Sequence, residues 1–166
     1  MTQLCALPPQ LVDAARKVVE ANLATGRKIA VAESCTGGLV TAAITEIAGS
    51  SAVFEAGFVT YSNEAKLDLL GVSSDVLETF GSVSIAVAWG MARGALERTG
   101  ADVAVAITGI AGPDGGSEQK PVGTVVFARA VRNAEEREAE SKLFAGADRS
   151  EVRRQATLCA LELLLP

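Results

Sequence analysis

The chain has 166 residues, the length of one ordinary domain, and 49% of them are hydrophobic, which excludes a wholly disordered protein. The formal net charge is −5, so there is no basic excess to neutralise the phosphates of a nucleic acid partner. The sequence contains no histidine, which excludes Ser-His-Asp and Cys-His catalysis and histidine-ligated metal sites. Acid–base chemistry near pH 7 must then come from a Lys, Tyr, Asp, Glu or Cys side chain with a shifted pKa.

The first part of the chain alternates helical and extended patterns. Apolar residues recur at helical spacing in three stretches, and short β-branched or apolar runs lie between them. In chain order, we expect a helix opened by Pro8 and Pro9 and stopped by Gly26, a strand at Lys28–Ala32, a turn at Glu33–Gly38, a helix from Leu39 ended by Gly49, a strand at Val53–Tyr61, and a helix from its N-cap Asn63 through Leu70.

The second part of the chain combines two more helices with three strands. Its longest loop, Gly109–Pro121, is dense in Gly and Pro. In chain order, we expect a short helical turn capped by Ser73 or Ser74 and reaching Phe80, a helix from Ser84 to about Thr99, a strand at Asp102–Thr108, strands at Val122–Val131 and Arg137–Phe144 joined by a hairpin turn at Asn133–Ala134, and a last helix capped by Asp148 or Ser150 and running to Leu164.

This order of elements predicts an α/β fold, because strands alternate with helices over most of the chain. We expect a three-layer α/β/α sandwich with a mixed, mostly parallel sheet, since the closing hairpin adds antiparallel strands. There is no internal repeat and no linker composition, so residues 1–166 are predicted to form a single domain with a core at about 11–164.

The cysteines and the apolar runs indicate where in the cell the protein is expected to act. Cys5, Cys35 and Cys159 are odd in number, widely spaced and outside any C-x-x-C motif, so neither a disulfide framework nor a zinc site is indicated. We therefore expect a cytoplasmic protein with no metal and no cofactor. No signal peptide and no apolar stretch of about 18 residues is evident, so we expect no membrane span.

The first candidate functional segment is the turn Glu33–Gly38, between a strand and a helix. Such a turn exposes a side chain beside a helix N-terminus, which suits a nucleophile facing an oxyanion or a bound phosphate. The alternative is a purely structural turn in which Ser34 or Thr36 is the N-cap. Cys35 is a rival nucleophile, but only the helix terminus would lower its pKa.

The second candidate segment, Tyr61–Lys66, follows a strand and enters a helix. Lys66 is either an ordinary solvated helix lysine or, if partly buried, a base whose pKa is lowered by desolvation. A neutral lysine can deprotonate a serine as histidine does elsewhere. Tyr61 could bridge the two groups or donate a proton.

The third segment begins at Thr108-Gly109-Ile110-Ala111-Gly112 and continues through the long glycine-rich loop. It contains neither a Walker motif nor G-x-G-x-x-G, but its backbone can approach a ligand closely. Further on, Arg149 and Arg153 are four positions apart and share a helix face, where they could clamp a phosphate or simply be solvated. We expect Trp89 to lie in the core.

Taken together, three runs strongly resemble the CinA C-terminal-domain family: AESCTGG, GSSAVFEAGFVTYSNEAK, and TGIAGPDGG with KPVGTV. The resemblance extends from about Leu11 to Leu164. It implies a three-layer sandwich, a dimer or higher homo-oligomer, and hydrolysis of the carboxamide of nicotinamide mononucleotide to nicotinic acid mononucleotide and ammonia. It also implies a serine amidohydrolase route that needs no metal, with Ser34 as nucleophile, Lys66 as base and Tyr61 as the accompanying tyrosine.

The candidate segments together define an expected substrate site for this small molecule. Two other functions stay open from the sequence: a non-catalytic nucleotide-binding module, and a hydrolase of another amide or lactam. The residues that we expect to bind substrate are Glu33, Cys35, Thr36, Gly37, Gly38, Thr108, Gly109, Gly112, Arg149 and Arg153.

Overall fold

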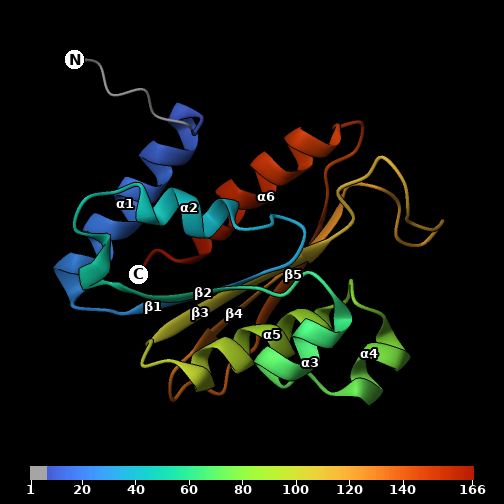
Figure 1. The fold of residues 1–166 in the computed structure, drawn as a ribbon, viewed down its shortest axis with the longest axis horizontal. Coiled ribbons are helices and arrows are strands. Elements are labelled where there is room, and N and C mark those ends of the chain that lie inside the picture. Colours follow the sequence, from blue (N-terminus) through green and yellow to red (C-terminus); the bar gives the residue numbers. More distant parts are fainter. Residues whose placement is uncertain (1–6) are drawn as a thin grey trace.

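The computed structural model describes residues 7–166 and has three layers, with helices on both faces of one five-stranded sheet (Figure 1). The expected α/β/α sandwich is therefore confirmed. The sheet order is β2-β1-β3-β4-β5. The strands are β1 (Ile29–Glu33), β2 (Phe54–Val59), β3 (Val103–Gly109), β4 (Thr124–Val131) and β5 (Glu138–Leu143). The helices are α1 (Pro9–Thr25), α2 (Leu39–Thr45), η1 (Ser50–Ala52, a 3-10 turn), α3 (Asn63–Leu70), α4 (Ser74–Phe80), α5 (Ile85–Arg98) and α6 (Arg149–Leu163).

The sheet is mixed, as the sequence predicts. Strand β1 pairs in parallel with β2 and β3, whereas β4 is antiparallel to both β3 and β5. Four strands therefore run in one direction and β4 runs against them. The carboxyl ends of β1, β2 and β3 meet at one edge, since Glu33 pairs with both Val59 and Ile107.

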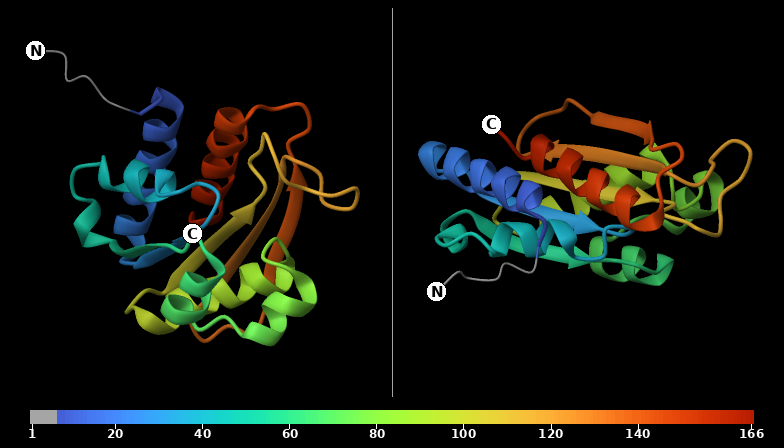
Figure 2. Two further views of the ribbon diagram at one scale, coloured as in Figure 1. Left: turned by 45° about the vertical axis from the view of Figure 1, so that its right-hand side comes forward. Right: turned by 90° about the horizontal axis from the view of Figure 1, so that it is seen from above.

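The two helical layers are packed on the sheet differently. Helices α1, α2 and α6 cover one face through larger side chains, including Ile29 and Val31 of β1, and α3, α4 and α5 cover the other (Figure 2). The second face is lined largely by alanines, such as Ala30 and Ala32, which let α5 approach closely. A Cβ at Gly94 of α5 would lie 2.0 Å from a backbone oxygen of α3, so this contact requires glycine.

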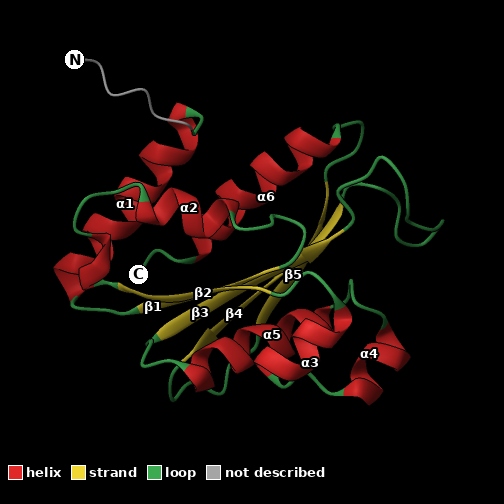
Figure 3. Ribbon diagram, in the orientation of Figure 1, coloured by secondary structure: helices red, strands yellow, loops and turns green. Residues whose placement is uncertain are grey.

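Most ends of the helices and strands, which Figure 3 distinguishes by colour, fall within a few residues of the prediction. Two expectations need correction. Ser62, rather than Asn63, caps α3, because its side chain accepts a hydrogen bond from the Ala65 amide at 3.0 Å. Trp89 is only partly buried: it packs against the core of the second face and also lines a surface pocket with Arg137, so it lies at the edge of the core and not within it. Position 5, with its cysteine, lies outside the described residues. None of the helices within residues 7–166 is both long enough and apolar enough to cross a membrane.

Candidate active site

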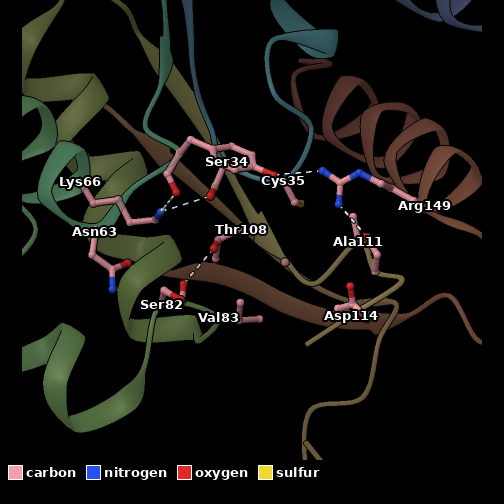
Figure 4. Close-up of a pocket in the computed structure, with 13 residues that line it drawn as sticks. Ser34, Cys35, Asn63, Lys66, Ser82, Val83, Thr108, Ala111, Asp114 and Arg149 are labelled. Atoms are coloured by element: carbon pink, nitrogen blue, oxygen red, sulfur yellow. Dashed lines mark hydrogen bonds between the residues drawn. The ribbon is translucent and has the colours of Figure 1, made fainter. Parts of the chain in front are cut away.

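A pocket of about 230 Å³ opens at the edge of the sheet where β1, β2 and β3 end (Figure 4). The second candidate segment and the long loop both reach it, as does the start of α6. The three candidate segments therefore meet at one edge of the sheet. The lining residues are Ser34, Cys35, Tyr61, Asn63, Lys66, Ser82, Val83, Thr108, Gly109, Ala111, Gly112, Asp114 and Arg149.

Ser34 and Lys66 are in direct contact within this pocket. The Lys66 Nζ atom lies 3.1 Å from Ser34 Oγ (Figure 4). Ser34 follows the last residue of β1, and its amide continues the ladder by donating to the Ile107 carbonyl at 2.8 Å. The backbone of Ser34 is thus held on its N–H side by the sheet.

Lys66 is the largest fully buried side chain of the described chain, only 1% exposed, and no carboxylate contacts its ammonium group within residues 7–166. Its other neighbours are backbone carbonyls: that of Thr60 at 2.9 Å, that of Ser62 at 3.4 Å and that of Tyr61 at 3.5 Å. Burial lowers the pKa of Lys66 below its ordinary value, because desolvation disfavours the ammonium form. A neutral amine here can donate to the carbonyls and accept the serine proton.

Cys35 also lines the pocket, but its thiol is buried and poorly suited to attack. Burial raises the pKa of Cys35 to about 12, so the thiol stays protonated near neutral pH. Only the thiolate is a strong nucleophile. The chemistry of the site therefore favours Ser34 over Cys35.

Tyr61 and Arg149 meet at the mouth of the pocket. The Tyr61 side chain is 60% exposed, and its hydroxyl accepts a hydrogen bond from Arg149 Nη2 at 3.0 Å. Arg149 Nη1 donates to the Gly112 carbonyl at 2.7 Å. Within the described chain, the Tyr61 group that faces Lys66 is its backbone carbonyl, so no hydroxyl bridge between Ser34 and Lys66 is present.

The third candidate segment contributes a wall of the pocket. Thr108 Oγ1 donates to the Ser82 carbonyl at 2.8 Å, which joins the end of β3 to the segment before α5. A Cβ at Gly109 would lie 2.8 Å from a Val125 side-chain carbon and 2.9 Å from the Thr124 carbonyl oxygen. Gly109 is therefore required by the close approach of β4, whatever it does for a ligand.

Five of the expected substrate-binding residues do not line this pocket: Glu33, Thr36, Gly37, Gly38 and Arg153. Conversely, the sequence did not single out Asn63, Ser82, Val83, Ala111 or Asp114 as binding residues. The Gly-Ser-Val-Ser run before α5 was a usable signal for Ser82 and Val83, since it is a polar interruption between two helices. Within residues 7–166, no group of His, Cys, Asp and Glu side chains could hold a metal ion.

Comparisons with known proteins find similar chains over most of the sequence. Residues 12–166 match the family model described as the CinA C-terminal domain. The chain is 54% identical over 155 residues to nicotinamide-nucleotide amidohydrolase PncC of Escherichia coli K12, covering 93% of both proteins. It shares 52% identity with the CinA-like protein of Geotalea daltonii, but covers only 33% of that longer chain.

Solved structures are similar over nearly the whole length. The competence/damage inducible protein CihA of Agrobacterium tumefaciens superposes with a TM-score of 0.93 at 46% identity, covering 97% of both chains. The competence damage-inducible protein A of Klebsiella pneumoniae gives a TM-score of 0.87 at 38% identity, covering 93% of this chain and 94% of that one. With the family-model match over residues 12–166, these similarities show that the chain belongs to the CinA C-terminal domain family.

Proposed function

We propose that the protein is an amidohydrolase that converts nicotinamide mononucleotide to nicotinic acid mononucleotide and ammonia, in the recycling of pyridine nucleotides. The observation that carries the reaction type is the 3.1 Å contact between Ser34 Oγ and the buried Lys66 Nζ. The name of the E. coli relative, at 54% identity over 93% of both chains, supports the choice of substrate.

In the first half of the proposed reaction, neutral Lys66 takes the hydroxyl proton of Ser34 as the serine oxygen attacks the carboxamide carbon. The carbonyl oxygen of the amide becomes the oxyanion of a tetrahedral intermediate. We assign the stabilisation of this charge to the backbone amide that follows Ser34, together with amides near Gly109. One such donor is typically worth about 10²–10³ in rate.

The intermediate then collapses, and the carbon–nitrogen bond breaks as Lys66 or Tyr61 gives a proton to the departing ammonia. The product of this half-reaction is an ester between Ser34 and the nicotinoyl group. Water attacks that ester, with Lys66 again accepting a proton, and nicotinic acid mononucleotide leaves as the serine hydroxyl is restored. All protons in this scheme move between the substrate, water and described side chains.

Arg149 is the group that we propose for the substrate phosphate. Its guanidinium lines the pocket and uses one donor on Tyr61 and one on Gly112. A guanidinium carries five N–H donors, so others are available to phosphate oxygens. The wall formed by Thr108, Gly109 and Gly112 would then hold the rest of the nucleotide.

We also propose that the protein acts in the cytoplasm as a homodimer or larger homo-oligomer, with the whole chain as one unit. The wide spacing of the cysteines supports the cytoplasmic location, and the family resemblance supports the oligomer. Light scattering of the purified protein gives the mass in solution, and a monomeric mass at working concentration would contradict the oligomer.

The test of function is ammonia release from nicotinamide mononucleotide, with the acid product identified by chromatography. Wild-type protein should release both in equal amounts. Ser34→Ala should abolish release, whereas Ser73→Ala is a matched control because the Ser73 side chain makes no capping hydrogen bond. Thermal stabilisation by the nucleotide without ammonia release would instead indicate a binding module. Turnover confined to other members of an amide panel would contradict the proposed substrate.

A further inference from the structure

Glu33 is a fully buried carboxylate that the proposed reaction does not use. It is the last residue of β1, and its solvent exposure is 0%. Its Oε2 atom accepts from Thr36 Oγ1 at 2.7 Å, the Gly38 amide at 2.9 Å and the Val40 amide at 3.2 Å. Its Oε1 atom accepts from both the amide and the hydroxyl of Thr41, each at 2.8 Å.

These contacts are the right kind for a buried anion. Burial of an unpartnered carboxylate is costly, but backbone amides and hydroxyls can replace its hydration. Three of the donors are amides of the first turn of α2 and the residue before it, which have no partner inside a helix. A Cβ on Gly57 of β2 would lie 2.2 Å from Thr41 Oγ1, so that glycine leaves room for the threonine hydroxyl.

Arg153 holds the same turn by donating to the backbone carbonyls of the turn. From α6, its Nε donates to the Cys35 carbonyl at 3.2 Å, and its Nη2 donates to the Thr36 carbonyl at 2.9 Å. Gly37, with a φ of +59°, lies against this guanidinium, and a Cβ there would be 3.4 Å from Arg153 Nη2. The turn that follows Ser34 is thus held by a carboxylate through its N–H groups and by a guanidinium through its C=O groups.

We infer that Glu33 and Arg153 are positioning residues, which hold the turn after Ser34 so that Ser34 Oγ stays in reach of Lys66 Nζ. The inference rests on the proposed function insofar as Ser34 is the nucleophile. It assigns neither residue to substrate contact. It also means that the amides at the start of α2 are committed to Glu33, so the substrate phosphate must bind elsewhere in the pocket, where Arg149 is the available cation.

Substitution of Glu33 or Arg153 should slow the reaction strongly, because proton transfer depends on a short distance. The Ser34–Lys66 contact is 3.1 Å, and proton transfer requires groups at hydrogen-bond distance. A displacement of about 1 Å in such a geometry can cost on the order of 10²-fold in rate. We call Glu33 and Arg153 together the clamp. Loss of either residue frees the turn after Ser34 to move by about this distance, while the pocket walls stay in place.

The experiment compares Glu33→Gln and Arg153→Met with two matched controls, Glu55→Gln and Arg93→Met. Both control residues form ion pairs on the surface, Glu55 with Lys28 and Arg93 with Glu97. Two readouts are used: kcat and KM for nicotinamide mononucleotide, and the rate at which a fluorophosphonate labels Ser34, followed by intact mass. The Ser34→Ala variant marks the unlabelled baseline.

We expect kcat and the labelling rate to fall together by about tenfold or more in both clamp variants, with KM changed by less than about threefold. The controls should match wild type. Thr41→Val removes one hydroxyl donor to Glu33 and leaves the amides, so it should give a smaller loss in both readouts. This milder variant keeps the inference testable if Glu33→Gln folds poorly.

Several outcomes would overturn the inference. A rise in KM with kcat intact would make Glu33 or Arg153 a substrate contact, and unchanged labelling in all three variants would remove the positioning role. Absence of wild-type labelling would show that Ser34 is not activated, which overturns both the inference and the serine mechanism. If nicotinamide mononucleotide is not hydrolysed but the clamp variants still slow labelling, the inference holds and only the proposed substrate fails.

Discussion

Lys66 Nζ lies 3.1 Å from Ser34 Oγ although the two residues are 32 positions apart. Ser34 follows β1 and Lys66 lies in α3, which follows the neighbouring strand β2. Parallel pairing of β1 and β2 therefore brings the ends of both strands, and the two side chains after them, to one edge of the sheet. The buried amine then lies within hydrogen-bond distance of the serine hydroxyl, which the proposed role of Lys66 as a base requires.

The pH dependence of turnover should follow Lys66. Burial lowers the pKa of Lys66, and only the neutral amine can take the serine proton. The rate of ammonia release should therefore rise with pH and reach its plateau below the ordinary lysine value of about 10.4. Initial rates between pH 5 and pH 10, corrected for spontaneous hydrolysis, measure this. A profile without a rising limb, under conditions where chemistry limits the rate, would count against Lys66 as the base.

Lys66 should also make folding stability depend on pH. Its pKa is lowered in the folded state, so between that value and the ordinary value the unfolded chain binds more protons. Stability of the wild type relative to Lys66→Met should therefore increase as pH rises through this window, by up to about 1.4 kcal/mol per pH unit. Urea titrations of both proteins across this window give the difference. Parallel stability curves would mean that burial does not shift this lysine.

Cys35 should be dispensable for chemistry. Burial raises the pKa of Cys35 to about 12, which leaves almost no thiolate at neutral pH. Cys35→Ser keeps the approximate size of the side chain and should retain kcat within about threefold, unlike Ser34→Ala. Loss of turnover in a folded Cys35→Ser protein would revive the cysteine as nucleophile.

Arg149 should discriminate between substrates with and without a phosphate. Hydrogen bonds to charged groups are typically worth about 1.5–3 kcal/mol, so Arg149→Met should raise KM for the nucleotide by roughly ten- to a hundredfold. The corresponding nucleoside, nicotinamide riboside, should show little change. Arg93→Met serves as a surface control. Equal losses for nucleotide and nucleoside would place the phosphate away from Arg149.

Tyr61 has two possible roles in the proposed reaction, as a proton donor or as a support for Arg149. Its side chain is 60% exposed, so Tyr61→Phe should leave the fold intact. If its hydroxyl supplies a proton to the departing ammonia, kcat should fall by about tenfold or more with little change in KM. The stopped-flow or steady-state rate of ammonia release decides this. A change confined to KM would instead mean that the hydroxyl supports Arg149, from whose Nη2 it accepts a hydrogen bond at 3.0 Å.

The sequence by itself determined the layered fold and predicted the polar segments from which the candidate site is built. Helical periodicity, the glycine stops and the short apolar strands are local signals, so the order of elements and most of their ends could be predicted. Ser34 and Lys66 could be singled out as candidates because both lie in polar segments that follow strands, while the roles of nucleophile and base came from the family resemblance. The family resemblance added the substrate class.

Tertiary structure alone decided which polar residues act as framework and which face the pocket. The sequence predicts Glu33, Thr36 and Arg153 as substrate-binding residues, yet none of them lines the cavity. Thr36 donates to the Glu33 carboxylate, and Glu33 and Arg153 bond backbone groups of the turn and of the start of α2. Ser82 reaches the pocket from a segment outside the motifs, and Asp114 reaches it from the glycine-rich loop, where the sequence singled out other residues. The physical reason is that the direction of a side chain, its burial and its donors depend on neighbours from distant strands and helices, which local sequence does not encode.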